Sequence, residues 1–332
     1  MDGENGLLKA LDSLYAMPDD YREFTVERAA ALDILRCGER QLDLLVGSGL
    51  QCERAGDGLR FDRYDLFNVA LGAQSGRSLP EISMRYALRW MQGGPATWTE
   101  PLDWAFEVEL TCPRDGGCGT DPRWQHAQLT PETAGGGLLD WRTEPENLPV
   151  RDGWVVHEGP GPVRLTGRLR TRGEALDVVS PRLREIVADF LAHDYGWARM
   201  PEALQADDAR VLAAGMAPCI TASRFLEREF RAAGYEARTR RGWLLGVLDL
   251  AHSWVEVVDD DGIVKCVDIA FRKLTEYAQN PHPELIDACV GFRFNRLLPL
   301  SIPAEGVMAH HRCGDSFITP RRRMSVRKMG RE

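Results

Sequence analysis

The chain has 332 residues, of which 44% are hydrophobic and 27% are charged, with a formal net charge of −9. No apolar run approaches the roughly 18–20 residues of a membrane span, and the acidic N-terminus lacks the basic and apolar segments of a signal peptide. We therefore expect a cytoplasmic globular protein with no membrane partner. The negative charge also disfavours nonspecific binding of nucleic acid.

The length predicts two domains, or one domain with a large extension. Residues 1–95 are predicted to form a helical module that weakly resembles a winged helix. Helices are expected from about 25 and over 40–50, and residues 58–67 should form a short strand that runs into another helix. The balanced charge of this segment favours a structural or carrier-docking role over DNA binding.

Residues 96–175 are rich in glycine, proline and tryptophan, and are predicted to form a β-rich accessory segment. Alternation of apolar and polar residues indicates strands over 104–111, 153–157 and 163–170. Helical spacing resumes over 181–203, within a predicted catalytic core that spans 176–310. The arginine-rich segment 311–332 is predicted to be a basic mobile tail.

The region after residue 215 contains the residue types of a nucleophilic site. Pro218 is expected in the first turn of a helix that continues to Gly234, which places Cys219 at the positive end of the helix dipole. This position lowers the pKa of a thiol and increases the fraction of thiolate. Backbone N–H groups at the same terminus could donate to a developing oxyanion.

A strand over 251–258 follows, in which alternation places His252, Trp254 and Glu256 on one face. The acidic turn after Val258 predicts a hairpin. If Val258 pairs with Gly262, His252 lies directly opposite Asp268 in the second strand, within reach of a hydrogen bond. A nucleophile, a base and an orienting carboxylate then form a cysteine triad, Cys219–His252–Asp268.

These residues resemble the core of the transglutaminase-like superfamily, in which a Cys begins a helix, a His lies in one strand and an Asp lies in the next. The resemblance covers residues of about 180–300 and implies an α+β fold with an antiparallel sheet packed against the Cys-bearing helix, the arrangement also called papain-like. It implies that Cys219 forms a thioester, that His252 relays the proton and that Asp268 holds the imidazole. Ile220 departs from the aromatic residue that follows the nucleophile in many members. Arylamine N-acetyltransferases share the triad, but their Arg-Gly-Gly run is absent here.

The function that this resemblance implies is a cysteine-dependent acyltransferase that forms an amide bond. We expect an acyl donor, which a carrier protein could deliver as a thioester, an amine acceptor, and a role in bacterial specialised metabolism such as antibiotic biosynthesis. A cysteine peptidase or amidase with the same triad is the first alternative. The second is a DNA-binding or partner-binding protein with a degenerate core. Candidate substrate or oxyanion contacts are Trp254, Tyr195, Trp197 and Gln205.

No cofactor is expected, because the sequence contains no phosphate-binding glycine loop. Cys112 and Cys118 with His126 could be imagined as zinc ligands, but they lack a CxxC knuckle and a fourth ligand. The run His310-His311-Arg312-Cys313 is also suggestive, but it is short and lies near the expected mobile end. Acidic residues 259–261 could attract calcium, although a charged hairpin tip is the simpler interpretation. The sequence alone therefore predicts no metal site.

Overall fold

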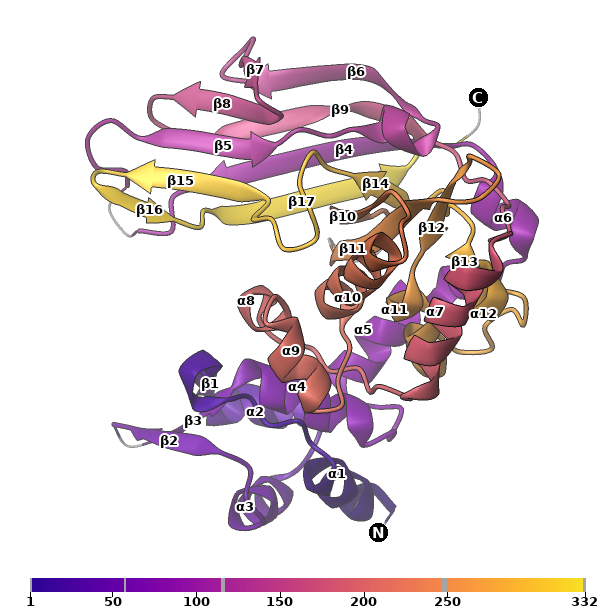
Figure 1. The fold of residues 1–332 in the computed structure, drawn as a ribbon. Coiled ribbons are helices and arrows are strands. Elements are labelled where there is room, and N and C mark those ends of the chain that lie inside the picture. Colours follow the sequence, from indigo (N-terminus) through magenta and orange to yellow (C-terminus); the bar gives the residue numbers. More distant parts are fainter. Residues whose placement is uncertain (1, 57, 115–116, 247–249, 331–332) are drawn as a thin grey trace.

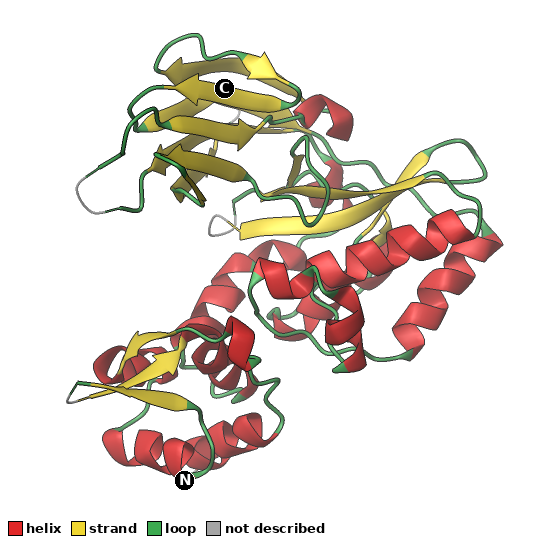
Figure 2. Ribbon diagram, turned by 60° about the vertical axis from the view of Figure 1, so that its left-hand side comes forward, coloured by secondary structure: helices red, strands yellow, loops and turns green. Residues whose placement is uncertain are grey.

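A computed structural model describes residues 2–56, 58–114, 117–246 and 250–330, with the side chains of 2–4 excluded. The fold is mixed α+β, and every pairing between its named strands is antiparallel. Figures 1 and 2 show a β-rich body at one end, a helical module with the N-terminus at the other, and a sheet with flanking helices between them. No helix in the described part of the chain is long and apolar enough to cross a membrane.

The N-terminal module packs helices around a small sheet of strand order β1-β3-β2. Its core is aliphatic, and Asp62 begins α4 by accepting hydrogen bonds from the amides of Tyr64 and Asp65. The helix expected from residue 25 is preceded by strand β1, so it begins three residues later. The elements are α1 (Asp2–Asp12), η1 (Asp19–Tyr21), β1 (Phe24–Glu27), α2 (Arg28–Leu35), α3 (Glu39–Gly47), β2 (Cys52–Ala55), β3 (Gly58–Asp62), α4 (Arg63–Gly72), α5 (Leu79–Ala87), η2 (Arg89–Gln92) and α6 (Pro95–Thr99).

Two sheets form the β-rich body and bury a shared core between them (Figure 1). One has the order β17-β4-β9-β6, with β4 (Leu102–Thr111), β6 (Gly137–Glu144), β9 (Val163–Thr171) and β17 (Arg321–Lys328). The other has the order β16-β15-β5-β8-β7, with β5 (Arg123–Ala127), β7 (Val150–Arg151), β8 (Trp154–Glu158), β15 (Ala309–Cys313) and β16 (Ser316–Ile318). The short helix η3 (Pro131–Ala134) precedes β6.

The C-terminal segment is therefore not the mobile tail that its arginines predicted. β17 pairs with β4 along eight residues, and Arg323 lies opposite Glu109. Met324 is buried while Arg321 and Arg323 are exposed, which is the alternation of a half-buried strand. This alternation was missed in the sequence because arginines occupy inward-facing as well as outward-facing positions of the strand. Arg331 and Glu332, which were counted in the tail, lie outside the described residues.

The third large sheet has the order β13-β12-β11-β10-β14 and carries the predicted core. One face packs against α7 and α10, through Val255, Val257 and Val267. Trp254 and Leu244 pack on the other side with residues of α5 and α11. The strands are β10 (Ala237–Leu244), β11 (Leu250–Val258), β12 (Val264–Val267), β13 (Val290–Gly291) and β14 (Leu297–Pro299). The helices are α7 (Pro181–Ala192), α8 (Glu202–Gln205), α9 (Asp208–Ala213), α10 (Cys219–Ala232), α11 (Ile269–Leu274), η4 (Thr275–Tyr277) and α12 (Leu285–Ala288).

The β11–β12 hairpin differs in register from the sequence-based prediction. Val258 pairs with Val264, not with Gly262, because the turn spans five residues and the Ile263 carbonyl accepts from the Asp259 amide. β12 ends at Val267, and Asp268 is the N-cap of α11 rather than a strand residue. A shift of two residues preserves the face on which each side chain lies. Asp268 therefore still faces the side of the sheet that carries His252.

Candidate active site

Cys219 is the first residue of α10, directly after Pro218. Proline at this boundary loses no helical hydrogen bond, because the first N–H groups of a helix have no partner within it. Leu226 and Phe230 anchor the helix by packing against the sheet, and Gly234, with a φ of +93°, follows its end. The half-buried Cys219 is thus held at a fixed position, with its thiol at the positive end of the helix dipole.

His252 and Asp268 form a buried hydrogen bond of 2.7 Å between Nε2 and Oδ2. Because a carboxylate accepts, Nε2 carries the proton that it donates, and Nδ1 is the nitrogen available to Cys219. The imidazole ring stacks on Phe271, with centroids 4.4 Å apart and planes within 4°. Asp268 is held in turn by the Phe271 amide, which donates to Oδ1 at 3.1 Å. These contacts fix the orientation of the ring.

Cys219 and His252 shift each other's pKa. Burial opposes ionisation of the Cys219 thiol, but a hydrogen bond and Coulomb attraction from His252, with a further contribution from Arg241, bring its pKa below the ordinary value of 9.0. Burial likewise opposes protonation of His252, but the Asp268 carboxylate outweighs it and raises the pKa of His252 to about 10. The site therefore favours a thiolate–imidazolium pair, which is the reactive form of a catalytic cysteine.

A cavity of about 290 Å³ opens at Cys219 and His252. Phe67 of α4 and Leu88, just after α5, line it from the N-terminal module, while Trp197 and Leu274 line it from the core. Its wall is thus mainly apolar, and the N-terminal module supplies part of it. Arg322 of β17 also reaches this cavity, so all three parts of the chain contribute to it.

Gln205 is the candidate contact that lies nearest the thiol. Its Oε1 is 3.7 Å from Cys219 Sγ and accepts a 3.4 Å hydrogen bond from the Ile220 amide. Its Nε2 donates to the Met200 carbonyl at 3.1 Å. The Thr221 hydroxyl donates to the Gln205 carbonyl and ties α8 to the start of α10. Gln205 is therefore built into the terminus that carries the nucleophile.

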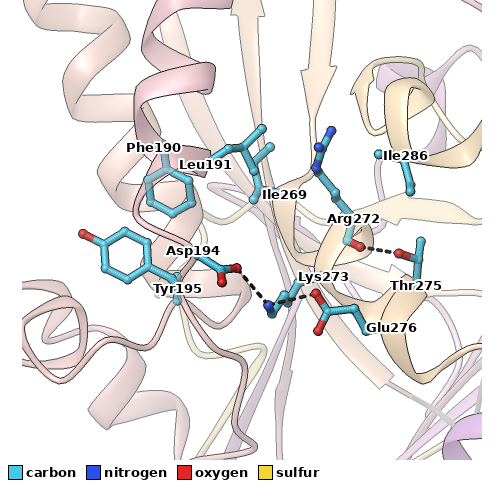
Figure 3. Close-up of a pocket in the computed structure, with 11 residues that line it drawn as sticks. Phe190, Leu191, Asp194, Tyr195, Ile269, Arg272, Lys273, Thr275, Glu276 and Ile286 are labelled. Atoms are coloured by element: carbon cyan, nitrogen blue, oxygen red, sulfur yellow. Dashed lines mark hydrogen bonds and ion pairs between the residues drawn. The ribbon is translucent and has the colours of Figure 1, made fainter.

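The other three candidate contacts lie in different places. Trp197 lines the Cys219 cavity. Trp254 is 1% exposed, and its ring packs beside His252 with centroids 6.3 Å apart. Tyr195 lines a second cavity, of about 290 Å³, where Lys273 forms ion pairs with Asp194 and Glu276 (Figure 3). The structure thus places Gln205 and Trp197 at the cavity, and neither Trp254 nor Tyr195 lines it.

Arg241 was not identified from the sequence. Its side chain is buried on β10, donates to Ser253 Oγ at 3.0 Å, and forms an ion pair with Glu202, which lines the Cys219 cavity. A buried guanidinium near the thiol favours the thiolate. The alternation of β10 offered no signal for it, because this strand contains three arginines and only the fold distinguishes them.

The chain was compared with protein-family models, curated protein sequences and solved structures. No protein-family model matches the chain, and no curated protein sequence matches it. Among solved structures, a "putative cysteine protease" from Cytophaga hutchinsonii is similar to 70% of this chain and 93% of its own, with 11% identity and a TM-score of 0.43.

Proposed function

We propose that this protein is a cysteine-dependent acyltransferase of the transglutaminase-like type, in which Cys219, His252 and Asp268 form the triad. One observation carries the proposal. A thiol with a lowered pKa lies at a helix N-terminus beside a histidine that a buried carboxylate orients. A structural cysteine buried in an apolar core would instead have a raised pKa, as Cys266 and Cys289 do because of burial.

In the first half-reaction, the Cys219 thiolate attacks the carbonyl carbon of the acyl donor. A C–S bond forms and the carbonyl electrons move onto oxygen. When the tetrahedral intermediate collapses, the bond to the leaving group breaks, and the His252 imidazolium gives its proton to that group. In the second half-reaction, neutral His252 takes a proton from the acceptor, which attacks the thioester and releases the Cys219 thiolate. Asp268 stabilises the imidazolium throughout.

The oxyanion of this intermediate needs donors near Sγ. The Cys219 backbone N–H belongs to the first turn of α10 and has no partner within the helix. Gln205 is the second donor in this proposal. Rotation of its amide by 180° gives up the hydrogen bonds with the Ile220 amide and the Met200 carbonyl and turns Nε2 toward the thiol. Negative charge on sulfur or oxygen favours this second orientation.

The cavity indicates the chemistry of the acyl donor. Its apolar wall, which includes Phe67, Leu88 and Trp197, suits an apolar acyl group, and Arg199 and Arg322 add positive charge. A phosphate-bearing carrier of a thioester, whether protein-bound or free, combines these two properties. We therefore propose an acyl thioester as donor and an amine as acceptor, with a place in bacterial specialised metabolism.

The same triad supports hydrolysis when water is the acceptor, so a cysteine peptidase or amidase remains the alternative. The decisive experiment is intact-protein mass spectrometry after incubation with a panel of acyl thioesters, with the Cys219→Ala variant as control. The expected result is an acyl adduct that requires Cys219 and is discharged faster by an added amine than by water. Equal discharge by water would favour the hydrolase, and an adduct that persists in Cys219→Ala would contradict the proposal.

A further inference from the structure

Three cysteines and a histidine that are far apart in the sequence meet at one end of the β-rich body. Cys112 directly follows β4, Cys118 lies in the loop before β5, and His311 and Cys313 belong to β15. Pairing of β15 with β5, in which His311 lies opposite Trp124, brings the two segments together. Cys112, Cys118 and His311 form the only group of metal-ligand side chains found among the described residues, and Cys313 lies beside it. None of these four residues lines the Cys219 cavity.

Two of the distances between these atoms match those of a tetrahedral zinc site. Cys112 Sγ lies 3.8 Å from Cys313 Sγ, and Cys118 Sγ lies 3.6 Å from His311 Nε2. With a Zn–S bond of about 2.3 Å and a Zn–N bond of about 2.05 Å, tetrahedral angles place two sulfurs about 3.8 Å apart and a sulfur and nitrogen about 3.6 Å apart. The ligand atoms of Cys112, Cys118 and His311 all lie within 4.8 Å of one another. One ion could therefore contact these three ligands, whereas Cys313 lies outside the group, 3.8 Å from Cys112, and its thiol has to move toward the ion to become the fourth ligand.

The surrounding groups hold the ligands in the form that a metal requires. His311 Nδ1 lies 3.0 Å from the Arg123 carbonyl, to which it donates, so Nε2 is left unprotonated and faces the cysteines. The imidazole also stacks on Trp124, with centroids 3.6 Å apart. The Gly119 amide donates to Cys313 Sγ at 3.2 Å, a bond that stabilises a thiolate. Both His311 and Cys313 are fully buried.

From this arrangement we propose that Cys112, Cys118, His311 and Cys313 bind one zinc ion. Once the Cys313 thiol moves to the ion, protein fills all four positions of a tetrahedron, which defines a structural site and not a catalytic one. Binding breaks the three S–H bonds and releases the protons to solvent, so the site is charged as Zn²⁺ with three thiolates and one neutral imidazole. The ion would fasten the loop after β4 to β15, and thus the C-terminal strands to the rest of the β-rich body.

From the sequence, Cys112 and Cys118 were considered with His126, and His311 and Cys313 were considered separately. His126 is not part of the cluster, and its Nδ1 donates to the Ala127 carbonyl at 2.7 Å. The missing ligands are His311 and Cys313, almost 200 residues after Cys112. A linear motif could not reveal this, because the four ligands meet only through strand pairing.

The test uses the full chain, reduced and stripped with a chelator, and then titrated with Co²⁺ as a spectroscopic probe for zinc. The proposal predicts saturation at one equivalent, with thiolate-to-cobalt charge-transfer bands and the intense ligand-field bands of a tetrahedral site. Zinc should displace the cobalt and raise the melting temperature. Cys112→Ser and Cys313→Ser should each weaken binding at least tenfold, whereas Cys37→Ser, a half-buried cysteine outside the cluster, should bind as the wild type does.

A wild-type chain without the charge-transfer bands would overturn the proposal, and this readout does not depend on whether a variant folds. Unchanged binding in folded Cys313→Ser would also overturn it. Protein purified without reductant could also be found to hold no metal and to contain a Cys112–Cys313 disulfide. That result would overturn the zinc site in favour of a covalent cross-link. Because the acyl-adduct experiment concerns Cys219 alone, either proposal can fail without the other.

Discussion

At the scale of single residues, the site depends on three side chains with distinct roles. In the proposed mechanism, Cys219 supplies the nucleophile and His252 moves the proton. Asp268 forms a hydrogen bond with His252 and caps α11. The cap matters for experiments, because an alanine at 268 would remove two functions at once. Asparagine keeps an oxygen that can accept from the Phe271 amide, so it isolates the role of the charge.

We predict that Asp268→Asn lowers kcat on the order of 10²–10⁴-fold with little change in donor binding, because the imidazolium loses its stabilising charge. The melting temperature should stay close to that of the wild type. Steady-state kinetics and thermal unfolding measured on the same preparation test this prediction. Full activity in the variant would remove Asp268 from the triad.

We predict that Gln205→Ala lowers kcat on the order of 10²–10³-fold, as expected for the loss of an oxyanion donor. Alkylation of Cys219 should change little, since alkylation generates no oxyanion. A variant that loses both kinetic activity and thiol reactivity would show that Gln205 only positions the start of α10.

Arg241 is predicted to act through the pKa of Cys219. Its positive charge lowers that pKa, so Arg241→Met should raise the pKa and move the pH profile of alkylation to higher pH. Arg241→Lys keeps the charge and should shift the profile less. Identical profiles for the wild type and the methionine variant would exclude this role.

At the scale of elements, local signals predicted the position of Cys219 and the face of His252. Pro218 and Gly234 predicted the two ends of one amphipathic helix. The bounds of α10, Cys219–Ala232, confirm this prediction. The hairpin register was wrong because turn length is not determined by an acidic composition alone, and the actual turn is two residues longer. Contacts between distant segments, such as the approach of Phe67 to the Cys219 cavity, left no local pattern.

The N-terminal module is predicted to take part in donor binding because α4 and α5 supply part of the cavity wall. Phe67→Ala should remove an apolar contact of about 1.5–3 kcal/mol and raise the KM for the donor roughly 10–100-fold. Alkylation of Cys219 by a small reagent should be unaffected. Leu44→Ala, an exposed residue of the same module, is the control and should leave KM unchanged. An unchanged KM for Phe67→Ala would separate the module from the site.

At the scale of the whole molecule, the N-terminal module and the C-terminal strand β17 both contribute to the wall of the Cys219 cavity. The wall therefore comes from segments that are about 250 residues apart in the sequence. The sequence indicated the α+β class and the candidate triad, because those depend on local periodicity. It did not indicate that residues 309–328 complete the two sheets of the β-rich body, since strand pairing over such distances leaves no local trace.

The central claim is that Cys219 is an activated thiol, and site-resolved alkylation across a pH series tests it most directly. Burial raises the pKa of Cys37, whereas His252 and Arg241 lower that of Cys219 below 9.0. We predict that Cys219 reacts faster than the other seven cysteines below pH 7, and that His252→Ala abolishes this difference. Equal rates for Cys219 and Cys37 in the wild type would contradict the account.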